Sequence, residues 1–173
     1  MVMLSTQRLD IRPLEPTDWQ QMQTLFADFM ASPLAPYDHP LPTDAPRVKT
    51  LTQSLAQSGL YYGVFLKGTP KLIGHVCFHP QEDSRDLGYC FHSSVHGKGY
   101  AFEAVSALIE ELVRSQGVCR FTAGTALDNK PSCNLLRRLG FVLTAQETVC
   151  MDGKHPFLGG QFLLELPPTK TNI

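Results

Sequence analysis

The sequence predicts a single α/β domain built on a mixed sheet, and two observations support this fold class. Segments with the apolar spacing of strands and of helices follow one another along all 173 residues, without a linker or an internal repeat. The length lies within the range of one domain, and 43% hydrophobic with 18% charged residues is a globular composition. We therefore expect one domain over residues 1–173, with residues 167–173 as a loose tail.

The first third of the chain is expected to hold one strand and two helices. Partial alternation of apolar and charged residues predicts a strand over residues 4–14. Apolar residues at helical spacing predict a helix over residues 19–29, which Thr17 or Asp18 can cap. Five prolines between residues 32 and 46 exclude a regular helix there, and a second helix is expected over residues 45–57.

The rest of the chain predicts six strands and two helices. The strands are expected over residues 61–67, 71–78, 86–91, 118–125, 142–151 and 157–166. The helices are expected over residues 99–115 and 130–139, and Gly140 supplies the C-terminal cap of the second. The pair Asp152-Gly153 predicts a tight hairpin turn between the last two strands.

Charge and cysteine content limit the partners and the compartment. Fifteen basic and sixteen acidic side chains give a net charge of −1, which does not favour nucleic acid or a membrane surface. No stretch reaches the ~18 apolar residues of a spanning helix, and the N-terminal residues do not read as a secretion signal. Five cysteines without a C-x-x-C pair predict buried, reduced thiols. We expect a soluble, cytoplasmic protein.

Residues 87–104 carry the strongest chemical signal. A strand ends there, Gly97 and Gly99 follow, and an amphipathic helix begins at once. The first amides of a helix lack partners within it, and glycines allow an anion to approach them. The spacing excludes a Walker A loop, because His92 and Gly99 stand where it needs glycine and Ser or Thr. Phe102 excludes a dinucleotide fingerprint, which leaves another kind of diphosphate cradle or a simple tight turn.

Residues 96–101, His-Gly-Lys-Gly-Tyr-Ala, resemble the acetyl-CoA diphosphate loop of the GNAT acetyltransferases, Arg/Gln-x-x-Gly-x-Gly/Ala. The longer string Gly-Lys-Gly-Tyr-Ala-x-Glu-Ala is typical of the branch that contains ribosomal-protein N-terminal acetyltransferases. Further motifs of that branch follow in the same order: residues 6–14 with Asp18-Trp19, residues 72–74, and Asn129-x-x-Ser132 with Leu139-Gly140-Phe141. The resemblance extends over nearly all of the chain.

The resemblance implies the single-domain GNAT fold, a mixed, splayed and mostly antiparallel sheet flanked by helices. Pantetheine is then expected in the gap between the strands over residues 86–91 and 118–125. The implied cofactor-binding residues are Phe91, His92, Ser93, His96, Gly97, Lys98, Gly99, Tyr100, Ala101, Asn129 and Ser132. Acetyl-CoA is the implied co-substrate, without a metal, in a monomer or homodimer. His96 departs from the family's arginine or glutamine, so weaker cofactor binding is expected.

Ser132 is the implied catalytic residue, because its hydroxyl can donate a proton to the departing CoA thiolate. An alternative role, shared with Asn129, is to cap the helix that follows. Amides near Phe91 and His92 are expected to polarise the thioester oxygen. The tyrosine acid of many GNAT enzymes is absent, because Leu136 stands in its place.

A general base is harder to assign. Val149 occupies the place of a glutamate in the ribosomal branch, and Glu147 is the nearest acid. Asp86 and His92 are the other candidates, although a solvated side chain is the commoner explanation for each. No metal site is expected, since the paired histidines lack the spacing of known metal motifs. These pairs are His75 with His79 and His92 with His96.

The implied reaction is transfer of an acetyl group from acetyl-CoA to a primary amine, by direct attack in a ternary complex. Without an evident base, the easier acceptor is a protein or peptide N-terminal α-amine, which the resemblance also implies. A small-molecule amine and a non-catalytic acyl-CoA sensor are the alternatives. The acceptor site is expected among the loop over residues 32–46, the first two helices and the final hairpin.

Overall fold

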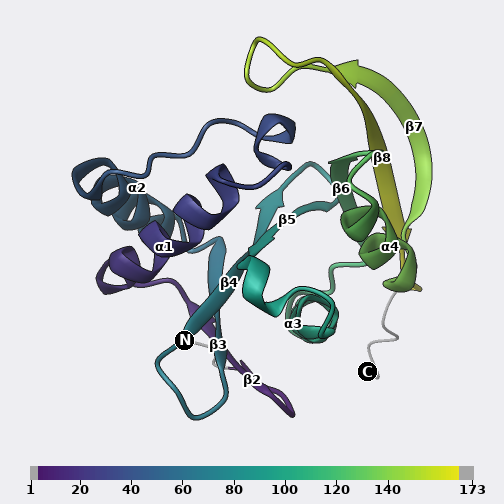
Figure 1. Cartoon of the computed structure of the whole chain (residues 1–173). Helices are drawn as coiled ribbons and strands as arrows, with labels where there is room; N and C mark the ends of the chain where they lie inside the picture. The colour runs from purple at the N-terminus through teal and green to yellow at the C-terminus, as the bar shows by residue number, and fades with distance from the viewer. Residues whose placement is uncertain (1–3, 168–173) are drawn as a thin grey trace.

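Eight strands form one sheet in the order β1-β2-β3-β4-β5-β6-β8-β7. Figure 1 shows how the chain runs through this sheet and its helices. The computed structural model describes residues 4–167. The strands are β1 (Leu4–Ser5), β2 (Leu9–Pro13), β3 (Tyr61–Leu66), β4 (Leu72–Pro80), β5 (Arg85–Phe91), β6 (Arg120–Ala126), β7 (Val142–Val149) and β8 (Phe157–Glu165). The helices are α1 (Trp19–Met30), α2 (Ala45–Ser58), α3 (Tyr100–Gln116) and α4 (Lys130–Arg138), with short 3₁₀ turns η1 (Pro16–Asp18), η2 (Ala35–Tyr37) and η3 (Ser93–Val95).

The sheet splays apart at its centre. β5 and β6 are parallel and pair at two positions, Arg85 with Phe121 and Asp86 with Thr122, whereas the other neighbouring strands are antiparallel. Beyond these positions the two strands separate, so the second half of β5 has no strand partner on that side. The mixed, splayed and mostly antiparallel sheet that the resemblance implied is confirmed.

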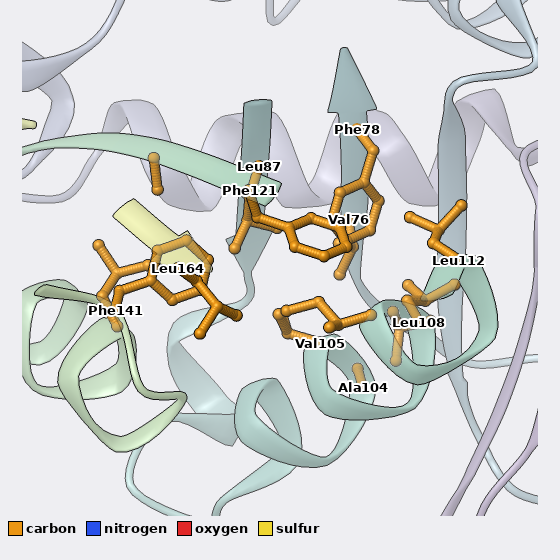
Figure 2. Close-up of a cluster of buried hydrophobic side chains, with 14 of the residues drawn as sticks. Val76, Phe78, Leu87, Ala104, Val105, Leu108, Leu112, Phe121, Phe141 and Leu164 are labelled. Carbon is orange, nitrogen blue, oxygen red and sulfur yellow. The ribbon is translucent and has the colours of Figure 1, made fainter. Parts of the chain in front are cut away.

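The two faces of the sheet are covered by different helices. Helices α3 and α4 pack on one face, where side chains such as Val76 and Phe121 form the larger core (Figure 2). Helices α1 and α2 cover the other face with a smaller core that includes Phe26. Neighbouring residues of β4 serve opposite cores, Leu72 the smaller and Ile73 the larger, as the alternation of side chains along a strand requires.

The predicted strand over residues 4–14 is in fact two short strands, β1 and β2. The chain turns back on itself between them, because its polar groups bind to α3 instead of to a neighbouring strand. The Thr6 hydroxyl and the Arg8 amide both donate to Oε1 of Glu103, at 2.6 Å and 2.9 Å. The prediction of one continuous strand was therefore wrong.

The predicted tight turn at Asp152-Gly153 is also wrong. The connection between β7 and β8 spans residues 150–156. The Asp152 carboxylate accepts hydrogen bonds from the amides of Lys154 and His155, both at 2.8 Å, and so organises a wider loop. Cys150 lies exposed at the start of this connection, contrary to the prediction of buried thiols.

The remaining expectations have mixed outcomes. All five thiols are free, with Cys77 and Cys133 buried and Cys90 and Cys119 half-buried. The other predicted helices and strands are present, with ends that differ by a few residues. Within residues 4–167, every helix is too short or too polar to cross a bilayer. The predicted loose tail, apart from Pro167, lies outside the described residues.

Candidate active site

A cavity of about 340 Å³ lies beside the half of β5 that has no partner on β6. Its walls come from α1 and the residues after it, the end of β5, the loop with η3, the start of α3, and α4. The lining residues are Asp28, Phe29, Ser32, Leu34, Tyr89, Cys90, Phe91, Ser93, Val95, His96, Gly97, Gly99, Ala101, Phe102, Asn129, Pro131, Ser132, Asn134, Leu135 and Arg138.

Helix α3 begins at this cavity with amides that no side chain caps. Gly99 is its N-cap residue with φ 79°, and Gly97 has φ 72°. By contrast, the carboxylate of Asp44 caps α2 and the side chain of Asn129 caps α4. A Cβ at Gly97 would meet no atom within 4 Å, so the loop is open there. Uncapped amides behind an open glycine loop fit the diphosphate of CoA.

The segment between β1 and β2 braces this loop. Arg8 donates to the Lys98 carbonyl at 2.9 Å and to the Glu103 carboxylate at 2.6 Å. Its guanidinium also lies over the Tyr100 ring, 4.4 Å from the centroid. Burial opposes ionisation of Glu103, but hydrogen bonds from Thr6 and Arg8 outweigh it and hold the pKa of Glu103 below its usual value. The segment around Arg8 and the glycine loop are therefore held together by direct side-chain contacts.

The end of β5 presents one free amide to the gap. His92 donates its amide to the Ile73 carbonyl of β4 at 2.9 Å. Because hydrogen bonds alternate along an antiparallel pair, the amide of Phe91 then points away from β4. The Phe91 carbonyl accepts from Nε2 of His96 at 2.8 Å, so His96 ties the glycine loop to the strand end. The two amides that were expected to polarise the thioester are therefore not equivalent, since that of His92 is already bonded.

The hydroxyls of Ser132 and Tyr89 lie 2.7 Å apart at the cavity wall. Burial raises the pKa of Tyr89 to about 12, so the phenol stays protonated. Either hydroxyl can donate this hydrogen bond, and when Tyr89 is the donor the hydrogen of Ser132 is free to point elsewhere. Asn129 caps α4 by accepting from the Ser132 amide at 3.2 Å. Of the two roles considered for this pair, capping belongs to the Asn129 side chain and not to the Ser132 hydroxyl.

Most of the predicted cofactor residues line the cavity, namely Phe91, Ser93, His96, Gly97, Gly99, Ala101, Asn129 and Ser132. The side chains of three others are occupied elsewhere. Nδ1 of His92 lies 2.9 Å from the Ser94 hydroxyl, and Nζ of Lys98 donates to the Ser94 carbonyl at 2.9 Å. Tyr100 packs beneath Arg8. These three contribute through the shape and the backbone of the loop.

The base candidates lie away from the cavity walls. Asp86 accepts from the Thr122 hydroxyl at 2.7 Å, where β5 and β6 still pair. Glu147 is exposed on β7. Nδ1 of His92 accepts from the Ser94 amide at 3.2 Å, so its lone pair is occupied.

Asp28 of α1 is a cavity residue that the sequence patterns did not predict. Among the described residues, it is the one carboxylate that lines the cavity. It accepts from the Ser93 amide at 2.8 Å and the Ser93 hydroxyl at 2.6 Å, and Nε2 of His92 lies 3.6 Å away. Burial opposes its ionisation, but the hydrogen bonds from Ser93 outweigh it and lower the pKa of Asp28. No pattern around Asp28 marks it out in the sequence.

Only some of the segments predicted to form the acceptor site lie at the cavity. α1 and the loop after it line the cavity, while α2, β7 and β8 do not. The loop nevertheless reaches the hairpin, since the rings of Tyr37 and Phe157 meet edge to face with centroids 5.1 Å apart. Arg138 of α4 also lines the cavity, with its guanidinium 4.6 Å from the centre of the Phe102 ring. Within residues 4–167, no three metal-ligating side chains gather.

Comparison with known proteins decides the family. The sequence pattern of the acetyltransferase (GNAT) domain matches residues 8–142. The chain belongs to the GNAT family. It is therefore an N-acetyltransferase that depends on acetyl-CoA, and it has the GNAT fold.

Individual GNAT relatives agree with this assignment. The uncharacterized N-acetyltransferase YnaD of Bacillus subtilis is 27% identical over 79% of this chain and 81% of its own length. The [ribosomal protein uS5]-alanine N-acetyltransferase of Escherichia coli is 32% identical over 56% of this chain and 53% of its own. A ribosomal L7/L12 α-N-protein acetyltransferase, RimL, solved in complex with coenzyme A, has the same fold, with a TM-score of 0.83 and 19% identity over 95% of this chain and 98% of that one.

Proposed function

We propose that this GNAT enzyme acetylates the N-terminal α-amine of a protein or peptide. The observation that carries the proposal is the lack of a strong base at the cavity. Among the described residues that line it, Asp28 is the one carboxylate, and its lowered pKa makes it a weak base. The Escherichia coli relative, named for an alanine of ribosomal protein uS5, supports the same class of acceptor.

The weakness of the base favours an acceptor that loses its proton easily. Only a neutral amine attacks a thioester. A free α-amine has a pKa of about 7.7–8.0 and a lysine side chain one of about 10.4. At pH ~7.4 the first is roughly a quarter neutral and the second about one part in a thousand. Lysine therefore demands about 3 kcal/mol more help from the site.

The residues that would hold acetyl-CoA follow from the free groups at the cavity. The uncapped amides of α3 and the loop over residues 97–99 receive the diphosphate, and Arg138 receives the 3′-phosphate. The free amide of Phe91 donates to the pantetheine arm or to the carbonyl oxygen that becomes negative during attack. When bound, acetyl-CoA supplies the thioester carbonyl.

Ser132 and Tyr89 act on the leaving group. As the new carbon–nitrogen bond forms and the carbon–sulfur bond breaks, Ser132 gives its hydroxyl proton to the departing sulfur and recovers a proton from the attacking nitrogen, so the products are a neutral amide and the CoA thiol. Tyr89 donates a hydrogen bond to Oγ of Ser132, which turns the Ser132 hydrogen toward the cavity. Positioning of the amine against the carbonyl supplies the rest of the rate enhancement.

Peptides that carry one free α-amine and one internal lysine test this proposal. After incubation with acetyl-CoA, tandem mass spectrometry should find the acetyl group on the α-amine. Acetyl groups mainly on lysine would contradict the proposal. Binding of CoA without acetylation of any amine in a broad panel would identify the chain as an acyl-CoA sensor instead.

A further inference from the structure

Asp28 reaches the cavity from the sheet face opposite to the glycine loop. It belongs to α1, which packs on one face together with α2, whereas the loop leads into α3 on the other face (Figure 1). The cavity therefore has walls from both sides of the splayed sheet. Its α3 and α4 side carries the helix amides and Arg138, which favour anions, and its α1 side carries a carboxylate.

The Asp28 carboxylate keeps hydrogen-bonding capacity for a ligand. A carboxylate has about four acceptor positions, and Ser93 fills two of them through its amide and its hydroxyl. The imidazole of His92 lies at 3.6 Å, beyond a normal hydrogen bond. A negative charge here would repel the phosphates of CoA, so it suits the second substrate.

We propose that Asp28 binds the acceptor as an ammonium ion and thereby selects which amines enter the site; the bound amine then releases its proton to solvent before it attacks. The inference rests on the proposed N-acetylation at this cavity. Ser93, at the end of β5, holds the carboxylate in place through two hydrogen bonds, so the charge is fixed before the acceptor arrives.

This charge predicts a specific preference. A free amino acid carries its own carboxylate next to the amine, and that group would face Asp28 at close range. A peptide or an amino acid amide has a neutral carbonyl at the same place. The enzyme should therefore favour peptide α-amines over free amino acids through like-charge repulsion as well as shape.

The test compares Asp28→Asn with Asp83→Asn. Asparagine at position 28 keeps an oxygen for the Ser93 amide but removes the charge. Asp83 is a matched control, since it is an exposed carboxylate between β4 and β5 that bonds to Arg120 and does not line the cavity. Titration calorimetry with saturating CoA measures binding of a tripeptide amide with a free N-terminus and of its N-acetylated form. Kinetics follow with whichever amine the wild-type enzyme acetylates.

The expected result is specific to the acceptor. The wild-type enzyme and Asp83→Asn should bind the free-amine peptide more tightly than its acetylated form, and Asp28→Asn should lose that preference. The acceptor KM should rise about tenfold or more in Asp28→Asn, while CoA affinity stays within about twofold and so reports an intact fold.

Three outcomes would overturn the inference. The first is no preference for the free amine in the wild-type enzyme, the second is an equal effect of Asp83→Asn, and the third is a parallel loss of CoA affinity in Asp28→Asn. The proposed function can fail separately. If the wild-type enzyme acetylates lysine or a small amine, the α-amine assignment falls, and the Asp28→Asn kinetics with that amine still decide the role of Asp28.

Discussion

At the scale of single residues, a tyrosine hydroxyl stands beside Ser132 although the chain lacks the family tyrosine at position 136. Leu136 is 1% exposed and packs in the larger core. The hydroxyl comes instead from Tyr89 of β5, a strand neighbour of the apolar residues Leu87 and Phe91 on the same face. In the proposed mechanism Tyr89 is a positioning residue, because it acts through Ser132.

Tyr89→Phe should lower kcat about tenfold and leave the KM for acetyl-CoA nearly unchanged. The variant removes the hydrogen bond that orients the Ser132 hydroxyl but keeps the ring. Steady-state kinetics at saturating acceptor measure the effect. In the double variant with Ser132→Ala, the two losses should not add, because both residues serve one proton. Additive losses would show that Tyr89 acts independently of Ser132.

His75 should make the fold sensitive to mild acid. It is buried on β4 beside the Tyr61 ring, and Nδ1 has no partner among the described residues. Burial lowers the pKa of His75 to about 4 from 6.5. Between these values the unfolded chain binds a proton that the folded chain does not, so stability falls as pH drops from 6.5 toward 4.

Urea unfolding at pH 7 and pH 5 measures this contribution. At pH 5 it should amount to about 2 kcal/mol of lost stability, because each pKa unit is worth about 1.4 kcal/mol. His75→Phe keeps an aromatic ring beside Tyr61 and should lose less stability between the two pH values. The exposed His39, changed to Gln, serves as the control. Equal acid sensitivity in all three proteins would refute the role of His75.

At the scale of elements, α3 differs from α2 and α4 in its start. The two shorter helices are capped by their own side chains, but α3 leaves its first amides open behind Gly97 and Gly99. With glycine at its N-cap instead of a capping side chain, this helix is less stable on its own by roughly a few tenths of a kcal/mol. The site therefore gains free amides at the expense of local stability, which the Arg8 brace offsets.

Gly97→Ala and Gly59→Ala separate backbone strain from ligand contact. Gly97 and Gly59 have φ of 72° and 68°, and a Cβ at either position would meet no atom within 4 Å. Both variants should lose about 1 kcal/mol of stability from left-handed backbone strain. Gly97 lines the cavity and Gly59 ends α2 elsewhere, so CoA affinity should fall about tenfold in Gly97→Ala alone. Equal CoA affinities in a calorimetric titration would remove the glycine loop from the binding site.

At the scale of the whole molecule, the parting of β5 from β6 creates the cavity. Hydrogen exchange followed by NMR can locate the pantetheine arm within it. The amide of Phe91 should exchange readily in the free enzyme and become protected when CoA binds, because it points into the gap. The amide of His92 should be protected in both states, since Ile73 already accepts its hydrogen bond. An unchanged Phe91 amide would place pantetheine elsewhere.

The sequence by itself determined the local features of this protein. The apolar stripe of α3, the glycines before it and the Asn129 cap of α4 depend on residues a few positions apart, so periodicity and turn chemistry predict them. The two elements predicted wrongly, the first strand and the last hairpin turn, are those where side chains capture backbone amides. Thr6, Arg8 and Asp152 each form hydrogen bonds that a local sequence pattern does not predict.

Only the tertiary structure decided which distant groups meet. Tyr89 and Ser132 are 43 residues apart, Asp28 and Ser93 are 65 apart, and Arg8 and Glu103 are 95 apart. These pairs depend on strand register, on the face that each helix covers and on where β5 leaves β6. A one-residue shift in register would turn Tyr89 to the opposite face, although every local pattern would stay the same. The packing of the sheet therefore decides which residues line the cavity.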